Sequence, residues 1–144
     1  MANKNPIPQA GTIPFLKIEG QIKIMIVTAR RSDGTFWITP KGKLEPDMTP
    51  AETAQMEALE EAGIKGRVAD KPIGCYTYEK NDEIYKVDVF PLEMTKVLKP
   101  EEWLESDERQ RRLVPVEQAV SLVSNRELAG LIQNIDWDKL SSLY

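Results

Sequence analysis

The sequence contains no histidine and only one cysteine, Cys75. Without histidine, zinc sites with imidazole ligands and Ser-His or Cys-His catalysis are excluded. A single cysteine cannot form an intramolecular disulfide, which is typical of proteins from reducing compartments. No apolar run reaches the roughly 18 residues that a membrane-spanning helix needs, and the opening residues, MANKNPIPQAG, contain no apolar signal segment. We therefore expect a cytoplasmic protein with no membrane partner.

The chain also lacks an excess of positive charge. Its 144 residues have a net charge of -4, with 41% hydrophobic and 29% charged residues, which is the composition of an ordinary globular protein. The isoelectric point near 5.0 means that no overall field attracts nucleic acid, so we do not expect a nucleic-acid partner. The length predicts a single domain over residues 1–144, with residues 1–8 as a flexible lead-in. We expect a monomer or a homodimer.

The hydrophobic pattern predicts an α/β fold. Strands are expected at 12–18, 21–29, 36–39, 74–79, 83–94 and 109–114, and C-terminal helices at 116–124 and 126–135. Pro14 predicts that the first strand is an edge strand or contains a bulge. Residues 96–107 are charged and lack a regular period, which favours a surface loop. Strands interleaved with helices in this order predict an α/β/α sandwich with a mixed β-sheet between helices.

The helix in the middle of the chain has clear start and stop signals. Thr49 is suited to the N-cap, Pro50 to the first helical position, and Glu52 completes a capping box. Gly63 is the expected C-terminal cap, because glycine readily adopts the left-handed conformation found there. The sequence therefore predicts a helix between Thr49 and Gly63.

Three glutamates, Glu57, Glu60 and Glu61, crowd the end of this predicted helix. Their spacing places them on one face, where each like-charged neighbour costs about 0.2–0.5 kcal/mol. Two of them also lie in the last turn, where the helix dipole disfavours anions. A divalent cation would turn this repulsion into attraction, because Mg²⁺ prefers carboxylate oxygens. The cluster therefore predicts metal ligands, and the alternatives are a solvated acidic face or a face that binds a basic partner.

The segment from Gly42 to Ile64, GKLEPDMTPAETAQMEALEEAGI, resembles the Nudix box, G-x5-E-x7-R-E-U-x-E-E-x-G-U, in which U is a bulky aliphatic residue. The matching positions are Gly42, Glu57, Glu60, Glu61, Gly63 and Ile64. The texture of the strands after the box resembles the diphosphoinositol-polyphosphate and diadenosine-polyphosphate branch of the Nudix hydrolase family. The resemblance implies a Nudix-type α/β/α sandwich over the whole chain.

The resemblance also implies a chemistry, the metal-dependent hydrolysis of a pyrophosphate bond. The substrate would be a small phosphorylated molecule, a nucleoside or inositol diphosphate linked to another moiety, with dinucleoside and diphosphoinositol polyphosphates favoured. Carried over by position, Glu57, Glu60 and Glu61 would hold Mg²⁺ or Mn²⁺, and Glu57 or Glu60 would accept the proton of the attacking water. A backbone oxygen of Lys41 or Gly42 would supply a further metal ligand.

Basic residues near the box are candidates for contacts to the substrate phosphates, because arginine and lysine bind phosphate oxygens. These candidates are Arg30, Arg31, Lys41 and Lys43. The alternative for each is a solubilising charge at a strand end. Further along, Arg109, Arg111 and Arg112 follow an acidic stretch, and they either line the substrate cleft or pair with those acids. Glu105 or Glu108 is a candidate for an additional base, and Trp103 for a mobile lid.

The sequence departs from the Nudix box at three positions. Met48 replaces the expected glutamate, Met56 the expected arginine and Ala58 the bulky aliphatic residue. In the family that glutamate and arginine form a pair, so we expect the two methionines to pack together and replace an ionic brace with an apolar one. The same departures support an alternative, a Nudix-fold binding or regulatory module with impaired catalysis. A further alternative is an RNA 5′-pyrophosphohydrolase, which the acidic charge disfavours.

Overall fold

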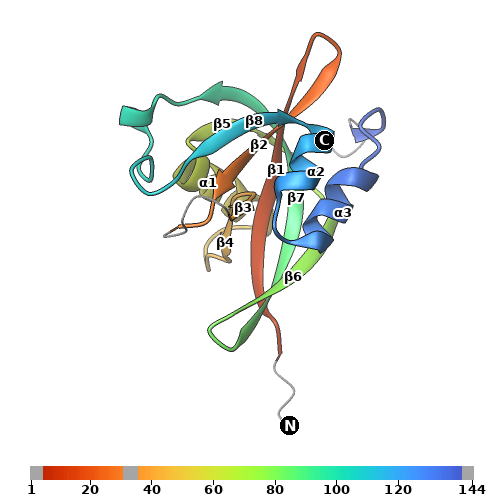
Figure 1. Cartoon of the computed structure of the whole chain (residues 1–144). Helices are drawn as coiled ribbons and strands as arrows, with labels where there is room; N and C mark the ends of the chain where they lie inside the picture. Colours follow the sequence, from red (N-terminus) through yellow and green to blue (C-terminus); the bar gives the residue numbers. More distant parts are fainter. Residues whose placement is uncertain (1–4, 31–35, 141–144) are drawn as a thin grey trace.

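The computed structural model describes residues 5–30 and 36–140 (Figure 1). In chain order the elements are β1 (Ile7–Ile18), β2 (Gln21–Thr28), β3 (Trp37–Ile38), β4 (Lys41–Lys43), α1 (Pro50–Ala62), β5 (Ile64–Val68), β6 (Gly74–Lys80), β7 (Glu83–Val97), the 3-10 helix η1 (Pro100–Glu102), β8 (Arg111–Pro115), α2 (Val116–Leu122) and α3 (Arg126–Asn134). Of these, β4, β5 and η1 are not predicted by the sequence pattern. The loop expected at 96–107 contains the end of β7 and η1.

The strands form one mixed, eight-stranded sheet with β1 at its centre. The main path runs β3-β2-β1-β7-β5, while β4 pairs with β1, β6 with β7 and β8 with β2. The pairing of β1 with β7 is parallel, and the other pairings are antiparallel. The long β6–β7 hairpin extends beyond the helices at one end of the molecule (Figure 1).

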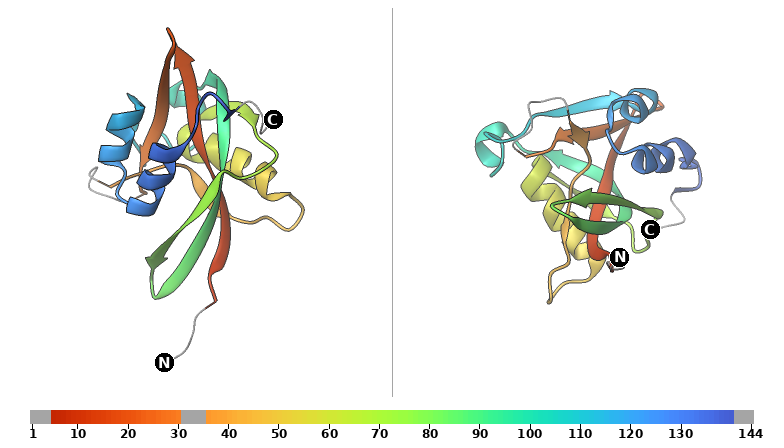
Figure 2. Two further views of the ribbon diagram at one scale, coloured as in Figure 1. Left: turned by 90° about the vertical axis from the view of Figure 1, so that its right-hand side faces the viewer. Right: turned by 60° about the horizontal axis from the view of Figure 1, so that its bottom comes forward.

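Helices cover both faces of this sheet. Along β2, Ile24 and Ile26 belong to the core cluster that includes residues of α2 and α3, whereas Met25 and Val27 belong to the cluster that includes α1. This alternation is the two-residue period of a strand that is buried on both faces. Figure 2 shows α1 on one side of the strands and α2 and α3 on the other. The predicted α/β/α sandwich with a mixed sheet is confirmed. In the described ranges, no helix is long and apolar enough to cross a membrane.

The prediction that Pro14 marks an edge strand is wrong, because β1 is the central strand. The backbone N–H of Thr12 donates to the Pro40 carbonyl on the side away from β7 (3.0 Å), so the nitrogen of Pro14 faces that same side by alternation. There, β4 pairs only with residues 9–11 and β2 only with residues 15–18, so no ladder partner requires the missing N–H. β1 also begins at Ile7, so the last two residues of the expected lead-in belong to the sheet.

The helix α1 begins and ends where the sequence predicts. The Thr49 side chain accepts from the Glu52 N–H, and the Glu52 carboxylate accepts from the Thr49 N–H, which completes the capping box. Gly63 has φ 65° and ψ 38° and donates its N–H to the Leu59 carbonyl at 3.0 Å. These two caps fix the position of the helix face that carries the glutamates.

Candidate active site beside helix α1

Glu57 lies against the backbone of β4. A side chain on Gly42 would occupy the space of the Glu57 carboxylate. Because glycine has no side chain, the carboxylate fits against the backbone at Gly42, and we call this space the cradle. Burial raises the pKa of Glu57 to about 8, and repulsion from Glu61 and Glu60 adds to the shift. The predicted glutamate face therefore exists, and its acids are close enough to repel one another.

Glu61 is the most buried of the three glutamates, at 7% exposed. Its Oε1 accepts from the backbone N–H of Lys41 at 3.1 Å, and its Oε2 lies 3.5 Å from Nη2 of Arg109. Burial raises the pKa of Glu61, while the charges of Lys41 and Arg109 oppose that shift. Glu61 is therefore held from two sides, by β4 and by the residues that lead into β8.

Arg109 joins Glu61 to Glu105. Its Nε donates to Glu105 Oε1 at 2.7 Å, and its Nη1 donates to the Thr28 carbonyl at 2.9 Å. Arg30 also pairs with Glu105 at 3.1 Å and with Glu108 at 2.9 Å. Glu105, one of the two candidates for an additional base, is thus buried beside the glutamates and shared between two arginines. Glu108 is about half exposed.

Trp103 and Arg111 lie at the carboxyl end of α1. Trp103 is 5% exposed and donates its indole N–H to the Glu60 carbonyl at 2.9 Å, so the expectation of a mobile lid is wrong. Arg111 donates to the Ala62 carbonyl at 2.7 Å. The neighbouring Arg112 instead lies over the ring of Trp37, 5.8 Å from its centroid. Of the three arginines, Arg109 therefore pairs with an acid of the preceding stretch, which is one of the two alternatives, and the other two contact a helix end and an aromatic ring.

A cavity of about 530 Å³ adjoins this site. It is lined by Ala29, Arg30, Phe36, Ile38, Lys41, Tyr76, Tyr78, Glu79, Lys80, Ser124, Asn125 and Leu128. Lys41 connects the cavity to the glutamates, because its backbone binds Glu61 and its ammonium lies 5.5 Å from the ring centroid of Tyr78. Burial lowers the pKa of this ammonium.

The predicted substrate-binding residues fall into three groups. Arg30 and Lys41 line the cavity. Lys43 is exposed on β4, where it pairs with Gln9, and it is not among the described residues that line the cavity. Arg31 lies outside the described residues. The structure therefore brings two of the four together with the glutamates.

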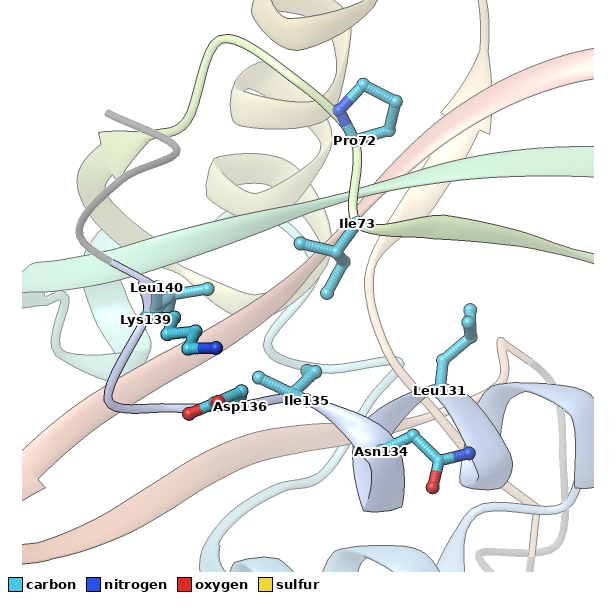
Figure 3. Close-up of a pocket in the computed structure, with 8 residues that line it drawn as sticks. All are labelled: Pro72, Ile73, Leu131, Asn134, Ile135, Asp136, Lys139 and Leu140. Carbon is cyan, nitrogen blue, oxygen red and sulfur yellow. The ribbon is translucent and has the colours of Figure 1, made fainter.

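A second hollow of about 410 Å³ lies between α3 and the segment before β6 (Figure 3). Figure 3 shows Ile73, Leu131 and Ile135 directed toward this space. None of the residues that line it is a predicted site residue. Of these two hollows, the cavity beside Lys41 is therefore the one that adjoins the glutamates.

Comparison with known proteins assigns this chain to a family. The model of the NUDIX domain matches residues 7–135. The chain belongs to the Nudix family. Nudix hydrolase 13, mitochondrial, of Arabidopsis thaliana is 34% identical over 109 residues, which are 69% of this chain and 52% of that protein. Diphosphoinositol polyphosphate phosphohydrolase 2 of Homo sapiens is 31% identical over 107 residues, 73% of this chain and 56% of that protein.

Two further facts limit what this similarity shows about function. The chain spans about half the length of the curated relatives that it matches. A solved structure of the Ap4A hydrolase of C. elegans superposes with a TM-score of 0.69 and covers 90% of this chain and 95% of that one, at 20% identity. At this identity, the superposition supports the Nudix fold and not a shared substrate.

The expected methionine brace of the Nudix box stays a prediction. Met48 is 41% exposed in the loop before α1. Met56 is half-buried, and among the described residues neither methionine belongs to a hydrophobic core cluster. The loop is connected to α1 by the Thr49–Glu52 capping box and by the Thr53 hydroxyl, which accepts from the Glu45 N–H at 3.3 Å. Hydrogen bonds at the start of the helix therefore connect it to this loop.

The Nudix glutamates suit a divalent cation in their chemistry. Among residues 5–30 and 36–140, no three acidic or cysteine side chains are already gathered as an assembled metal site. The donor set is nevertheless one that Mg²⁺ or Mn²⁺ accepts, because Glu57, Glu60 and Glu61 offer carboxylate oxygens beside the cradle at Gly42. The repulsion among these acids is also what a bound cation would relieve. These residues therefore fit the metal that the family implies.

Proposed function

We propose that this chain is a Nudix-type hydrolase that cleaves a pyrophosphate bond in a nucleoside diphosphate linked to another moiety. One observation carries the proposal. The Glu57 carboxylate sits in the cradle at Gly42, next to a buried Glu61, and Lys41 connects this pair to a cavity of about 530 Å³. Lys41 therefore lies between acids that suit a metal and a hollow that suits the rest of the substrate.

The roles follow from these positions. Glu57, Glu60 and Glu61 would hold Mg²⁺ or Mn²⁺, which supplies screening of phosphate charge and a more acidic bound water. Glu57 or Glu60 accepts the proton of the attacking water. Lys41 and Arg30, on the wall of the cavity, contact the phosphate oxygens next to the scissile bond. Arg109 keeps Glu61 oriented from the buried side.

The lining of the cavity favours a nucleoside over a highly phosphorylated inositol. One relative is named for diphosphoinositol polyphosphate, and one structural neighbour is an Ap4A hydrolase. An inositol polyphosphate carries phosphates around the whole ring and requires cations on all sides. Here the cations are Arg30, Lys41 and Lys80, accompanied by the acid Glu79 and by aromatic and apolar walls. A nucleobase can pack on such walls, because its flat face stacks on aromatic rings.

The test is a substrate panel with Mg²⁺ and with Mn²⁺. It includes diadenosine polyphosphates, nucleotide sugars, diphosphoinositol polyphosphates and RNA with a 5′-triphosphate. We expect turnover of a dinucleoside polyphosphate that Glu57→Gln and Glu60→Gln abolish. Glu117→Gln is the matched control, because Glu117 is exposed on α2, on the opposite face of the sheet from α1. Turnover that survives both site substitutions would contradict the assignment.

The panel also separates the rival functions. A binding or regulatory module with impaired catalysis would bind a nucleotide in the presence of metal without product formation. Preferred turnover of the diphosphoinositol substrate would contradict the argument from the cavity walls but retain the hydrolase. Release of pyrophosphate from RNA alone would identify the RNA 5′-pyrophosphohydrolase.

A further inference from the structure

The carboxyl end of α1 concentrates negative charge. Glu60 and Glu61 lie in its last turn, which contains no basic residue. The unpaired carbonyls at this end carry the negative pole of the helix dipole, so they repel the same two carboxylates. Charge compensation must therefore come from outside the helix.

Two side chains contact these carbonyls, one from the segment between β7 and β8 and one from the first residue of β8. The indole N–H of Trp103 donates to the carbonyl of Glu60 at 2.9 Å. Nη1 of Arg111 donates to the Ala62 carbonyl at 2.7 Å and to the Gly63 carbonyl at 3.3 Å. The guanidinium of Arg111 also stacks on Trp103, 4.5 Å from the ring centroid. We call Trp103 and Arg111 the α1 clamp.

The α1 clamp is packed closely against the helix end. A side chain on Gly63 would lie 2.7 Å from Nη1 of Arg111 and 2.7 Å from Cγ of Trp103. Glycine is therefore required here for space as well as for its positive φ. The second amino group of Arg111 donates to the Leu98 carbonyl, and the Leu98 N–H donates to the Gly63 carbonyl at 2.7 Å. One arginine thus joins the end of α1 to the chain that leaves β7.

We propose that Trp103 and Arg111 are positioning residues that hold Glu60 and Glu61 where they bind the divalent cation. The proposal rests on the proposed function. Trp103 fixes the peptide of Glu60, and Arg111 places a positive charge at the negative end of the helix. The same segment supplies Arg109, which contacts the Glu61 carboxylate itself. Both glutamates are therefore held by one segment, Glu60 through its backbone and Glu61 through its side chain.

The experiment is a titration with Mn²⁺ alone, followed by thermal shift in the absence of substrate. Trp103→Phe keeps an aromatic ring and removes the N–H donor, and Arg111→Gln removes the charge. Matched controls are Trp137→Phe, because Trp137 packs on Phe15 in the other core, and Arg112→Gln, because Arg112 lies on Trp37. Groups that orient metal ligands typically change metal affinity by about 10–100-fold. We expect each clamp substitution to raise the half-saturating Mn²⁺ concentration about tenfold and each control to leave it unchanged.

Three results decide between the possibilities. A raised Mn²⁺ midpoint, with a loss of kcat that saturating Mn²⁺ restores and an unchanged KM, would support the proposal, as would partial recovery in Arg111→Lys. A lower melting temperature with an unchanged Mn²⁺ midpoint would show a purely structural role and overturn it. Absence of any Mn²⁺ response in the unsubstituted protein would instead contradict the proposed function, and the clamp would then have no cation to serve.

Discussion

Arg109 and Glu61 form an ion pair in the interior of the protein, with Nη2 and Oε2 3.5 Å apart and side chains only 6% and 9% exposed. The same guanidinium donates to Glu105 and to the Thr28 carbonyl. One cation therefore compensates two buried acids from different parts of the chain. Because a buried charge without a partner is costly, the same arginine both stabilises the fold and holds Glu61 in position.

Removal of this arginine should strongly destabilise the protein. Arg109→Met leaves Glu61 and Glu105 buried without their shared partner, and breaking a buried pair costs about 3–5 kcal/mol. Urea unfolding of the metal-free protein measures the loss. The control is Arg67→Met, because Arg67 pairs with Glu93 on the surface, where such a pair contributes about 0–1 kcal/mol. Equal losses in the two variants would contradict a special role for Arg109.

Gly42→Ala should impair the site while the fold persists. The new methyl group would occupy the space of the Glu57 carboxylate and force that side chain out of its cradle. We expect metal affinity, measured by thermal shift with Mn²⁺, to fall by about tenfold or more. The control is Gly130→Ala in α3, where no atom lies within 4 Å of an added methyl group. That change should stabilise the helix by about 0.5–1 kcal/mol and leave metal binding unaltered.

Much of the fold could be predicted because its signals are local. The helix α1 has a cap at each end within its own sequence, and its predicted limits agree with the structure. By contrast, β5 was beyond prediction because it is short and its register shifts between Lys65 and Gly66. The central position of β1 was hidden by Pro14, since local sequence does not reveal that its missing N–H falls in a gap between two partner strands.

The glutamates of the site could be grouped from the sequence because they share one element. Glu57, Glu60 and Glu61 follow a helical spacing, which a sequence displays directly. Arg111 and Trp103 instead contact residues of α1 that lie 49 and 43 positions earlier in the sequence, respectively. Local periodicity contains no information on such pairs. The only available signal was a group of arginines after an acidic stretch, which did not indicate which acid each one would meet.

The pKa of Glu57 predicts that the metal-free protein loses stability as the pH rises. Burial first, and then Glu61 and Glu60, raise this pKa from 4.5 to about 8. Between these values the unfolded chain has lost a proton that the folded chain still holds, so the free energy of unfolding falls with increasing pH. The stabilisation by protonated Glu57 is complete below pH 4.5 and is lost as the pH rises through about 8. Urea unfolding with a chelator present should show this fall, and Glu57→Gln should make it shallower.

A divalent cation should bind more tightly as the pH rises over the same range. The cation has to displace the proton from Glu57, so each binding event releases a proton and the affinity rises by up to about tenfold per pH unit. Thermal shift with Mn²⁺ at about pH 6 and about pH 8 measures the difference. In Glu57→Gln the dependence on pH should weaken, because that position no longer exchanges a proton. An equal dependence in both proteins would assign the proton to another group.

Lys41→Met should weaken substrate binding while its backbone still holds Glu61. The Lys41 side chain lines the cavity, whereas the bond to Glu61 comes from its backbone N–H and survives the substitution. A hydrogen bond to a charged group contributes about 1.5–3 kcal/mol, so KM for a dinucleoside polyphosphate should rise at least about tenfold. Lys43→Met is the control, since Lys43 lies two residues along the same strand, is exposed and is not among the described residues that line the cavity. A comparable rise in KM in both variants would indicate a diffuse attraction by surface charge and would contradict a specific contact between Lys41 and the substrate.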